Sequence, residues 1–119
     1  MAWAFNLTLS QLTMADLRNK KFGILIAAAP DQPNFAHALG LAESGLKKGL
    51  LVYVYCIDEA VRGVADGRLQ DLKTRGLNLF ACAYSAQQRQ IPVTEDAAFA
   101  GLTVVSDLIA ATDRFVSFN

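Results

Sequence analysis

The chain has 119 residues and a mass of 12.9 kDa, the size of a single domain that buries roughly two-thirds of the surface its unfolded form exposes. Eleven Lys and Arg residues balance eleven Asp and Glu residues, so no excess positive charge favours binding to nucleic acid. The hydrophobic fraction of 53% argues against disorder. Together with the zero net charge, it predicts a homo-oligomer in which some apolar surface meets another subunit.

The apolar runs are short, and the cysteines are few. The longest runs, 22–30 and 50–57, fall well below the ~18 residues that a membrane-spanning helix requires, so we expect no membrane association. No Lys or Arg precedes Arg18, so the charged start of a secretory signal is missing and a cytoplasmic location is expected. Cys56 and Cys82 are too few for a disulfide framework and lack zinc-site spacing, which predicts free thiols and no metal. No GxGxxG motif follows the first apolar run, so no cofactor is expected.

Residues 1–20 differ from the rest of the chain. Apolar side chains alternate there with small or polar ones, at Trp3, Phe5, Leu7 and Leu9. Thr13 and Asp16 resemble a weak capping box. We expect an extended arm followed by a short helix, with the arm covering a sheet edge or a neighbouring subunit. The alternative is a frayed terminus held by one aromatic anchor.

The first part of the α/β domain, expected over 21–119, has the pattern of a strand-helix-strand unit. Residues 22–29 form a continuous apolar run, typical of a strand buried on both faces in a parallel sheet. Residues 35–48 carry apolar side chains at three- and four-residue steps, and Gly49 ends this helical pattern. Residues 50–57 are a second buried run, at the spacing of a right-handed parallel unit.

The remaining segments repeat this unit with variations. The predicted elements are a short broken helical stretch (58–67), a helix containing Leu69 and Leu72 and ending at Arg75, a third strand (77–82), about two helical turns (83–89), a helical stripe from Val104 to Thr112 and a last strand (114–118). Residues 97–101 fit either a short fourth strand or the first turns of a helix begun at Thr94.

Both cysteines lie where a parallel sheet collects reactive groups, beyond the carboxyl ends of its strands. Cys82 directly precedes the short helix that contains Ser85 and Arg89. Unpaired backbone N–H groups and the positive end of the helix dipole would stabilise its thiolate, and Arg89 would add positive potential. The alternative for Cys82 is a small apolar residue packed in the core. Cys56 is either a second sulfur-carrying or resolving thiol or a packed residue.

The strand-end loops also supply a candidate pocket. Its predicted lining residues are Pro30, Asp31, Gln32, Asp58, Tyr84, Ser85 and Arg89. The adjacent acids Asp58 and Glu59 could bind a cation, but such residues more often begin a helix and stabilise its dipole. The single histidine, His37, is expected on the surface of a helix without a special role.

Three segments of the chain resemble the DsrE/DsrF-like family. They are Phe22-Gly-Ile-Leu-Ile before a proline-containing loop, Val52-Tyr-Val-Tyr-Cys-Ile-Asp58, and Ala81-Cys-Ala-Tyr-Ser-Ala-Gln-Gln-Arg89 before an Ile-Pro loop. The ending, 111–118, resembles the family as well, so the resemblance covers 21–119. Many relatives have glycine where this chain has Ala83 and Gln90.

The resemblance implies a fold and an activity. The fold would be a single-domain, flavodoxin-like α/β three-layer sandwich with a mostly parallel five-stranded sheet, in which 97–100 is the fourth strand. The family forms homo- or hetero-oligomers, which suggests a trimer or hexamer here. Its sulfur-relay members carry a persulfide on a cysteine after the third strand, and Cys82 falls on that position.

The sequence therefore predicts a sulfur carrier or sulfurtransferase that holds a persulfide on Cys82. Its partners would be a sulfur-donor and a sulfur-acceptor protein. One alternative is a non-catalytic oligomeric module of the same fold that binds a small ligand or acts as a scaffold. Another is a thiol redox protein that pairs Cys56 with Cys82, which requires the two side chains to face one another within disulfide range.

Overall fold

Five parallel strands form one sheet in the computed structural model, which describes residues 17–119. The strands are β1 (Lys21–Ile26), β2 (Leu51–Cys56), β3 (Asn78–Cys82), β4 (Ala98–Ala100) and β5 (Arg114–Phe118). The helices are α2 (Pro33–Lys47), the 3₁₀ helix η2 (Asp58–Gly63), α3 (Gly67–Thr74), α4 (Ala83–Gln88) and α5 (Thr103–Ala111). The expected arm and the capping box of the short helix lie in residues 1–16, outside the described residues.

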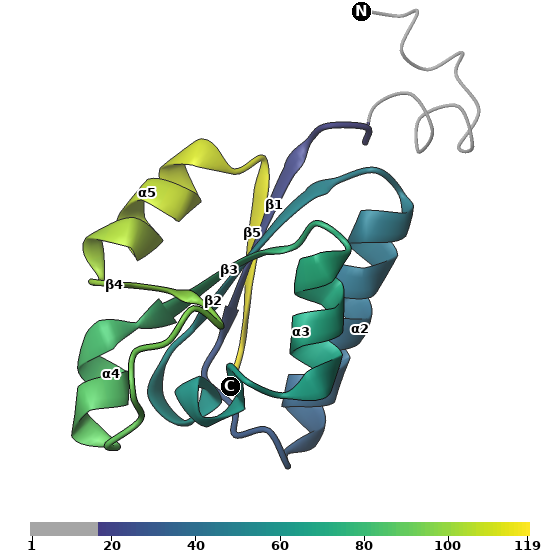
Figure 1. Cartoon of the computed structure of the whole chain (residues 1–119). Coiled ribbons are helices and arrows are strands. Elements are labelled where there is room, and N and C mark those ends of the chain that lie inside the picture. The colour runs from purple at the N-terminus through teal and green to yellow at the C-terminus, as the bar shows by residue number, and fades with distance from the viewer. Residues whose placement is uncertain (1–16) are drawn as a thin grey trace, which may run out of the picture.

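The sheet has the order β4-β3-β2-β1-β5, and every neighbouring pair is parallel. Helices α2 and α3 cover one face, whereas α4 and α5 lie on the other (Figure 1). This three-layer α/β arrangement confirms the predicted flavodoxin-like fold. It also decides between the two interpretations of 97–101, because β4 is a strand and α5 begins only at Thr103.

The α2 face of the sheet is densely packed. Side chains alternate between the faces along each strand, and on this side Ile24, Ile26, Val52 and Val54 are all fully buried. Helix α2 lies close to the strands: a Cβ atom on Gly45 would stand 3.0 Å from Val52 Cγ2. Glycine at this position therefore lets α2 pack close to the sheet, and the side chains buried between them form the core of the domain.

The α5 face is covered less completely. A Cβ atom on Gly23 would stand only 2.5 Å from Phe115 Cδ2 of β5, so β1 requires glycine at this position. Farther along the same face Leu25 and Tyr53 are half-buried, and Leu108 is the buried residue of α5. This face therefore keeps accessible apolar surface. Within residues 17–119, every helix is too short or too polar to cross a membrane.

Candidate functional site around Cys82

Cys82 lies at the point where β3 turns into α4. It is the last residue of the strand and the N-cap of the helix, and its Sγ accepts a hydrogen bond from the Ser85 backbone N–H at 3.4 Å. The sulfur thus takes the place that an oxygen of Ser, Thr or Asp usually takes at a helix N-terminus. Only 1% of Cys82 is exposed. The predicted position at a strand end facing helix N–H donors is present, in a closed environment.

The environment of the Cys82 sulfur stabilises its charged form. Burial raises the pKa of the Cys82 thiol, but hydrogen bonds from the Ser85 hydroxyl and N–H, the Tyr55 hydroxyl and the Tyr84 N–H together bring it below its ordinary value. These groups carry protons that can point at a thiolate. A thiol with a lowered pKa is a better nucleophile at neutral pH.

Ser85 connects Cys82 to the end of the neighbouring strand. It is the buried polar residue of the described chain, 3% exposed, and its hydroxyl oxygen accepts the Asp58 backbone N–H at 3.1 Å. Its own O–H proton is then free for the sulfur. Asp58 adopts a left-handed conformation, with a φ of 53°, that turns the chain from β2 into η2 and presents this N–H. Asp58 therefore contributes through its backbone.

Tyr55 is a site residue that our sequence analysis missed. It is fully buried on β2, and its hydroxyl donates to the carbonyls of Ala100 and Gly101, at 3.1 and 3.2 Å, while also contacting Cys82. Burial and the neighbouring Cys82 raise the Tyr55 pKa, so its proton is retained. A signal was present in the sequence, because a tyrosine in a strand predicted to be buried on both faces needs a partner for its hydroxyl.

Arg89 binds a carboxylate of η2. Its Nε donates to Glu59, and one terminal nitrogen donates to the Ser85 carbonyl at 3.3 Å. The expectation that Arg89 adds positive potential to Cys82 stays a prediction: Arg89 forms an ion pair with Glu59, and that carboxylate is shared with Arg62. Glu59 also accepts from Arg62, and both contacts lower the pKa of its carboxyl. This acid secures η2 against α4.

Cys56 and Cys82 lie on opposite faces of the sheet. Cys56 is the register partner of Ala81, so Cys56 and Ala81 point to one side and Cys82, the next residue, points to the other. Both are free thiols. Burial alone raises the Cys56 pKa to about 12. The interpretation as a thiol redox protein that pairs Cys56 with Cys82 is therefore contradicted.

The side chains of the other predicted pocket residues are not gathered around Cys82, and Tyr84 contributes there through its backbone N–H alone. The Pro30 carbonyl accepts from Arg68 of α3 at 3.2 Å, and the Gln32 side chain accepts the Ala29 N–H at 2.8 Å within its own loop. Asp31 is exposed. Tyr84 is 62% exposed, and its hydroxyl accepts from Gln88 at 2.8 Å. A ligand pocket built from these residues stays a prediction.

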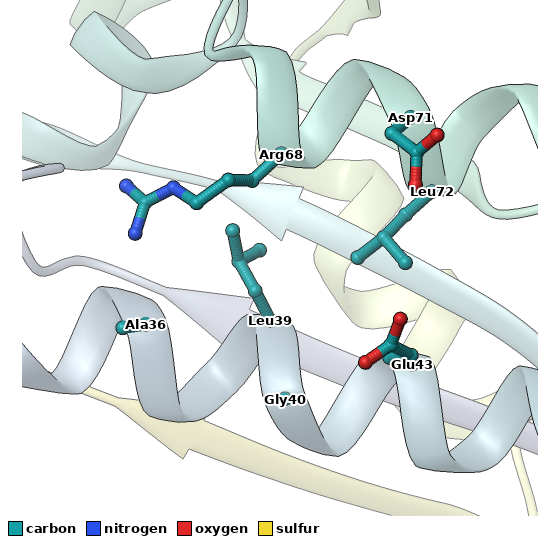
Figure 2. Close-up of a pocket in the computed structure, with 7 residues that line it drawn as sticks. All are labelled: Ala36, Leu39, Gly40, Glu43, Arg68, Asp71 and Leu72. Carbon is teal, nitrogen blue, oxygen red and sulfur yellow. The ribbon is translucent and has the colours of Figure 1, made fainter.

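Two hollows of the described surface lie elsewhere. One, of about 310 Å³, separates α2 from α3: Leu39 and Leu72 point into it, with Arg68 toward one end and Glu43 and Asp71 toward the other (Figure 2). The second, of about 400 Å³, is at the amino ends of the strands. It is lined by Leu17, Lys20, Lys21, Phe22, Leu50, Asp113 and Arg114. Neither is lined by Cys82.

Comparison with known proteins identifies the family and the fold. The model of the DsrE/DsrF-like family matches residues 20–118. Among solved structures, the crystal structure of the YchN protein from E. coli is similar, with a TM-score of 0.71 and 15% identity over 84% of this chain and 99% of that chain. At this identity the likeness concerns the fold. Comparison with curated proteins gives no match.

Proposed function

The chain belongs to the DsrE/DsrF-like family, which is associated with sulfur relay, and we propose that it carries sulfur as a persulfide on Cys82. The observation that supports this most is the set of hydrogen-bond donors around the Cys82 sulfur, which lowers its pKa despite burial. Such donors stabilise a thiolate, the nucleophilic form of cysteine.

The proposed reaction moves one sulfur atom without net oxidation. The Cys82 thiolate attacks the outer, sulfane sulfur of a donor protein's persulfide, an S–S bond forms to Cys82, and the donor leaves as its thiolate. An acceptor thiolate then attacks the outer sulfur of the Cys82 persulfide. The second attack returns Cys82 to its thiolate, so each cycle needs only a donor protein and an acceptor protein.

A second candidate function follows from the burial of the same residue. With only 1% of its surface exposed, Cys82 could simply fill space between β3 and α4, as a small apolar residue does. The protein would then be a non-catalytic oligomeric module that binds a small ligand or acts as a scaffold. The reactivity of Cys82 in the folded protein separates the two functions.

We also propose that the chain forms a homo-oligomer, a trimer or a hexamer, through its α4–α5 side. Large apolar side chains are exposed there on α4, on the loop after it, and at both ends of α5: Tyr84, Val93, Leu102 and Ile109. Association would remove this surface from water. A mass of 12.9 kDa in light scattering over a wide concentration range would contradict the proposal.

The persulfide is tested by treating the folded protein with polysulfide and locating the added mass by mass spectrometry. We expect additions of about 32 Da on Cys82. The matched variants are Cys82→Ser, which should abolish the adduct, and Cys56→Ser, which should keep most of it. The reason is that at pH ~8 a thiol of pKa about 12 is ionised to only ~0.01%, whereas Cys82 ionises more readily than an ordinary thiol.

Two results would contradict the assignment. Sulfur found on Cys56 while Cys82 stays unmodified would show that the wrong thiol was chosen. If neither cysteine reacts in the folded protein, although both are modified in denaturant, the binding module becomes the better description.

A further inference from the structure

Sulfur chemistry at Cys82 requires access that the closed structure does not give. The sulfur is enclosed by the first turn of α4, by Tyr55 of β2 and by the end of β4, where Ala100 is the register partner of Cys82. A donor persulfide cannot reach the sulfur of a residue that is only 1% exposed. At least one of these three covering elements has to move.

The end of β4 is the least firmly held of the three. Strand β4 has three residues and, in the part of the chain that the structure describes, lies at the edge of the sheet and pairs with β3 alone. The turn that follows it, here called the β4–α5 turn (residues 100–103), is exposed at Gly101 and Leu102. Short edge strands with few contacts open at low free-energy cost.

Tyr55 fastens this turn from the middle of the sheet. The register pairs Tyr55 with Phe80 and Phe80 with Ala98, and Cys82 and Ala100 lie two residues farther along on the same face. The Tyr55 hydroxyl nevertheless reaches the carbonyls of Ala100 and Gly101, so its side chain crosses β3 between Phe80 and Cys82. The hydroxyl therefore lies between the sulfur and the turn.

A phenol has a single proton to donate. We infer that the Tyr55 hydroxyl latches the β4–α5 turn over Cys82: it donates to the turn carbonyls while the sulfur is a thiol and turns to the sulfur once it is a thiolate, which frees the turn to open. A charged acceptor attracts the proton more strongly than a neutral carbonyl. The released carbonyls of Ala100 and Gly101 are then hydrated as the turn moves outward.

Within residues 17–119, few other charged groups are available to compete with the Cys82 thiolate for the Tyr55 proton. In that part of the chain, the ionisable side chains on the elements packed around the sulfur are Tyr53, Tyr55 and Cys56 on β2, Asp58, Glu59 and Arg62 on η2, and Tyr84 and Arg89 on α4 and its C-cap. Cys56 points to the opposite face of the sheet. Glu59 is paired with Arg62 and Arg89, and Tyr84 is exposed. Residues 97–106, which contain β4 and the start of α5, carry no ionisable side chain.

The latch deepens the proposed function by giving the same site a control of access, but it needs only ionisation of Cys82. Hydrogen exchange of the peptide that covers 98–106, followed by mass spectrometry at one pH, tests it. Tyr55→Phe removes the hydroxyl and keeps the ring, and should speed exchange about three- to tenfold, as expected for the loss of one ordinary hydrogen bond. Tyr53→Phe is the matched control: within residues 17–119 its hydroxyl makes no hydrogen bond with the turn. It lies on the same strand and face and should change nothing.

A second experiment keeps Tyr55 and varies the pH instead. At pH ~9 the wild-type peptide 98–106 should exchange faster than in Cys82→Ser, whose hydroxyl stays neutral, and the difference should shrink as the pH falls to ~6 and Cys82 becomes protonated. Equal exchange at both values, or no effect of Tyr55→Phe, would overturn the latch. Failure of polysulfide to modify Cys82 while both exchange effects are present would refute the sulfur carrier and leave the latch intact.

Discussion

The two cysteines are the last residues of neighbouring strands, at the carboxyl end of the sheet, yet they lie in different environments. Cys56 points to the α2–α3 face, where burial alone raises its pKa to about 12. Cys82 points to the α4–α5 face, where the hydroxyls and N–H groups around it lower its pKa in spite of burial. Cys82 directly follows Ala81, the register partner of Cys56, so the two sulfurs lie on opposite faces because side chains alternate between faces along a strand.

The two faces differ in packing as well as in polarity. The α2–α3 face is filled by aliphatic side chains, and its α2 side chains Phe35, Ala38, Leu39 and Ala42 are buried. On the α4–α5 face the nine-residue α5 contributes one buried residue, Leu108, and α4 has six residues. The first face supplies the stability of the domain, and the second leaves room for a site and for an interface.

The largest expected effect concerns this difference in packing. Ile24 and Leu25 are consecutive residues of β1 on opposite faces, the first fully buried and the second half-buried. Ile24→Ala should lower the free energy of unfolding by about 2–5 kcal/mol, because it removes buried methyl groups and leaves a cavity. Leu25→Ala should cost less than half as much in urea unfolding of dilute protein.

The same pair of variants sharpens the oligomer proposal. If the α4–α5 side is covered by another subunit, the cost of Leu25→Ala should grow with protein concentration while that of Ile24→Ala stays constant. Equal costs for the two variants at every concentration would contradict the difference between the faces.

Much of the fold could be predicted from the sequence. The buried run 22–29 overlaps β1 except for its first residue, the run 50–57 contains β2, and the stripe through Phe35, Leu39 and Ala42 marks the buried side of α2. Such patterns depend on the spacing of apolar residues within one segment, which can be seen directly in the sequence. The fourth strand could not be settled in this way, because three residues are too few to show a period, and the family resemblance was needed.

The candidate site was predicted only in part. Cys82 and Ser85 follow from a strand that turns into a helix, a local signal. The contribution of Tyr55 depends on its hydroxyl reaching Gly101, 46 residues later, and the ion pair of Arg89 is with Glu59, 30 residues earlier. Contacts at such separations are set by strand order and register, which the periodicity of one segment does not contain.

The next largest effect concerns the pH dependence of the free energy of unfolding, to which the two thiols contribute with opposite sign. Folded Cys56 keeps its proton to about pH 12, while in the unfolded chain it ionises near pH ~9. Its contribution to folding is therefore complete below pH ~9 and is lost above that value, by about 1.4 kcal/mol per pH unit relative to Cys56→Ala. Urea unfolding of both proteins from pH 7 to 10.5 measures this difference, and other ionising groups cancel.

Cys82 should behave in the opposite way. Its folded pKa is lowered, so the unfolded chain binds the proton more tightly and the wild type gains stability relative to Cys82→Ala as the pH rises through the window below the unfolded pKa. The gain is complete above the unfolded value and is lost as the pH falls through the folded one. If both variants shift in the same direction, the contrast between the faces is wrong.

The smallest effect concerns the hydroxyl that joins the two strand ends on the Cys82 side. Ser85→Ala removes the acceptor of the Asp58 N–H and one donor to the Cys82 sulfur. We expect it to lower the free energy of unfolding by about 1 kcal/mol, the usual contribution of one hydrogen bond, and to raise the Cys82 pKa. Alkylation of Cys82 near pH 7 should therefore slow, and its pH profile should move to higher pH. Ser106→Ala, an exposed serine of α5, is the control. A loss of stability with an unchanged alkylation profile would mean that Ser85 holds η2 in place without acting on the sulfur, and that the backbone N–H groups and Tyr55 alone activate Cys82.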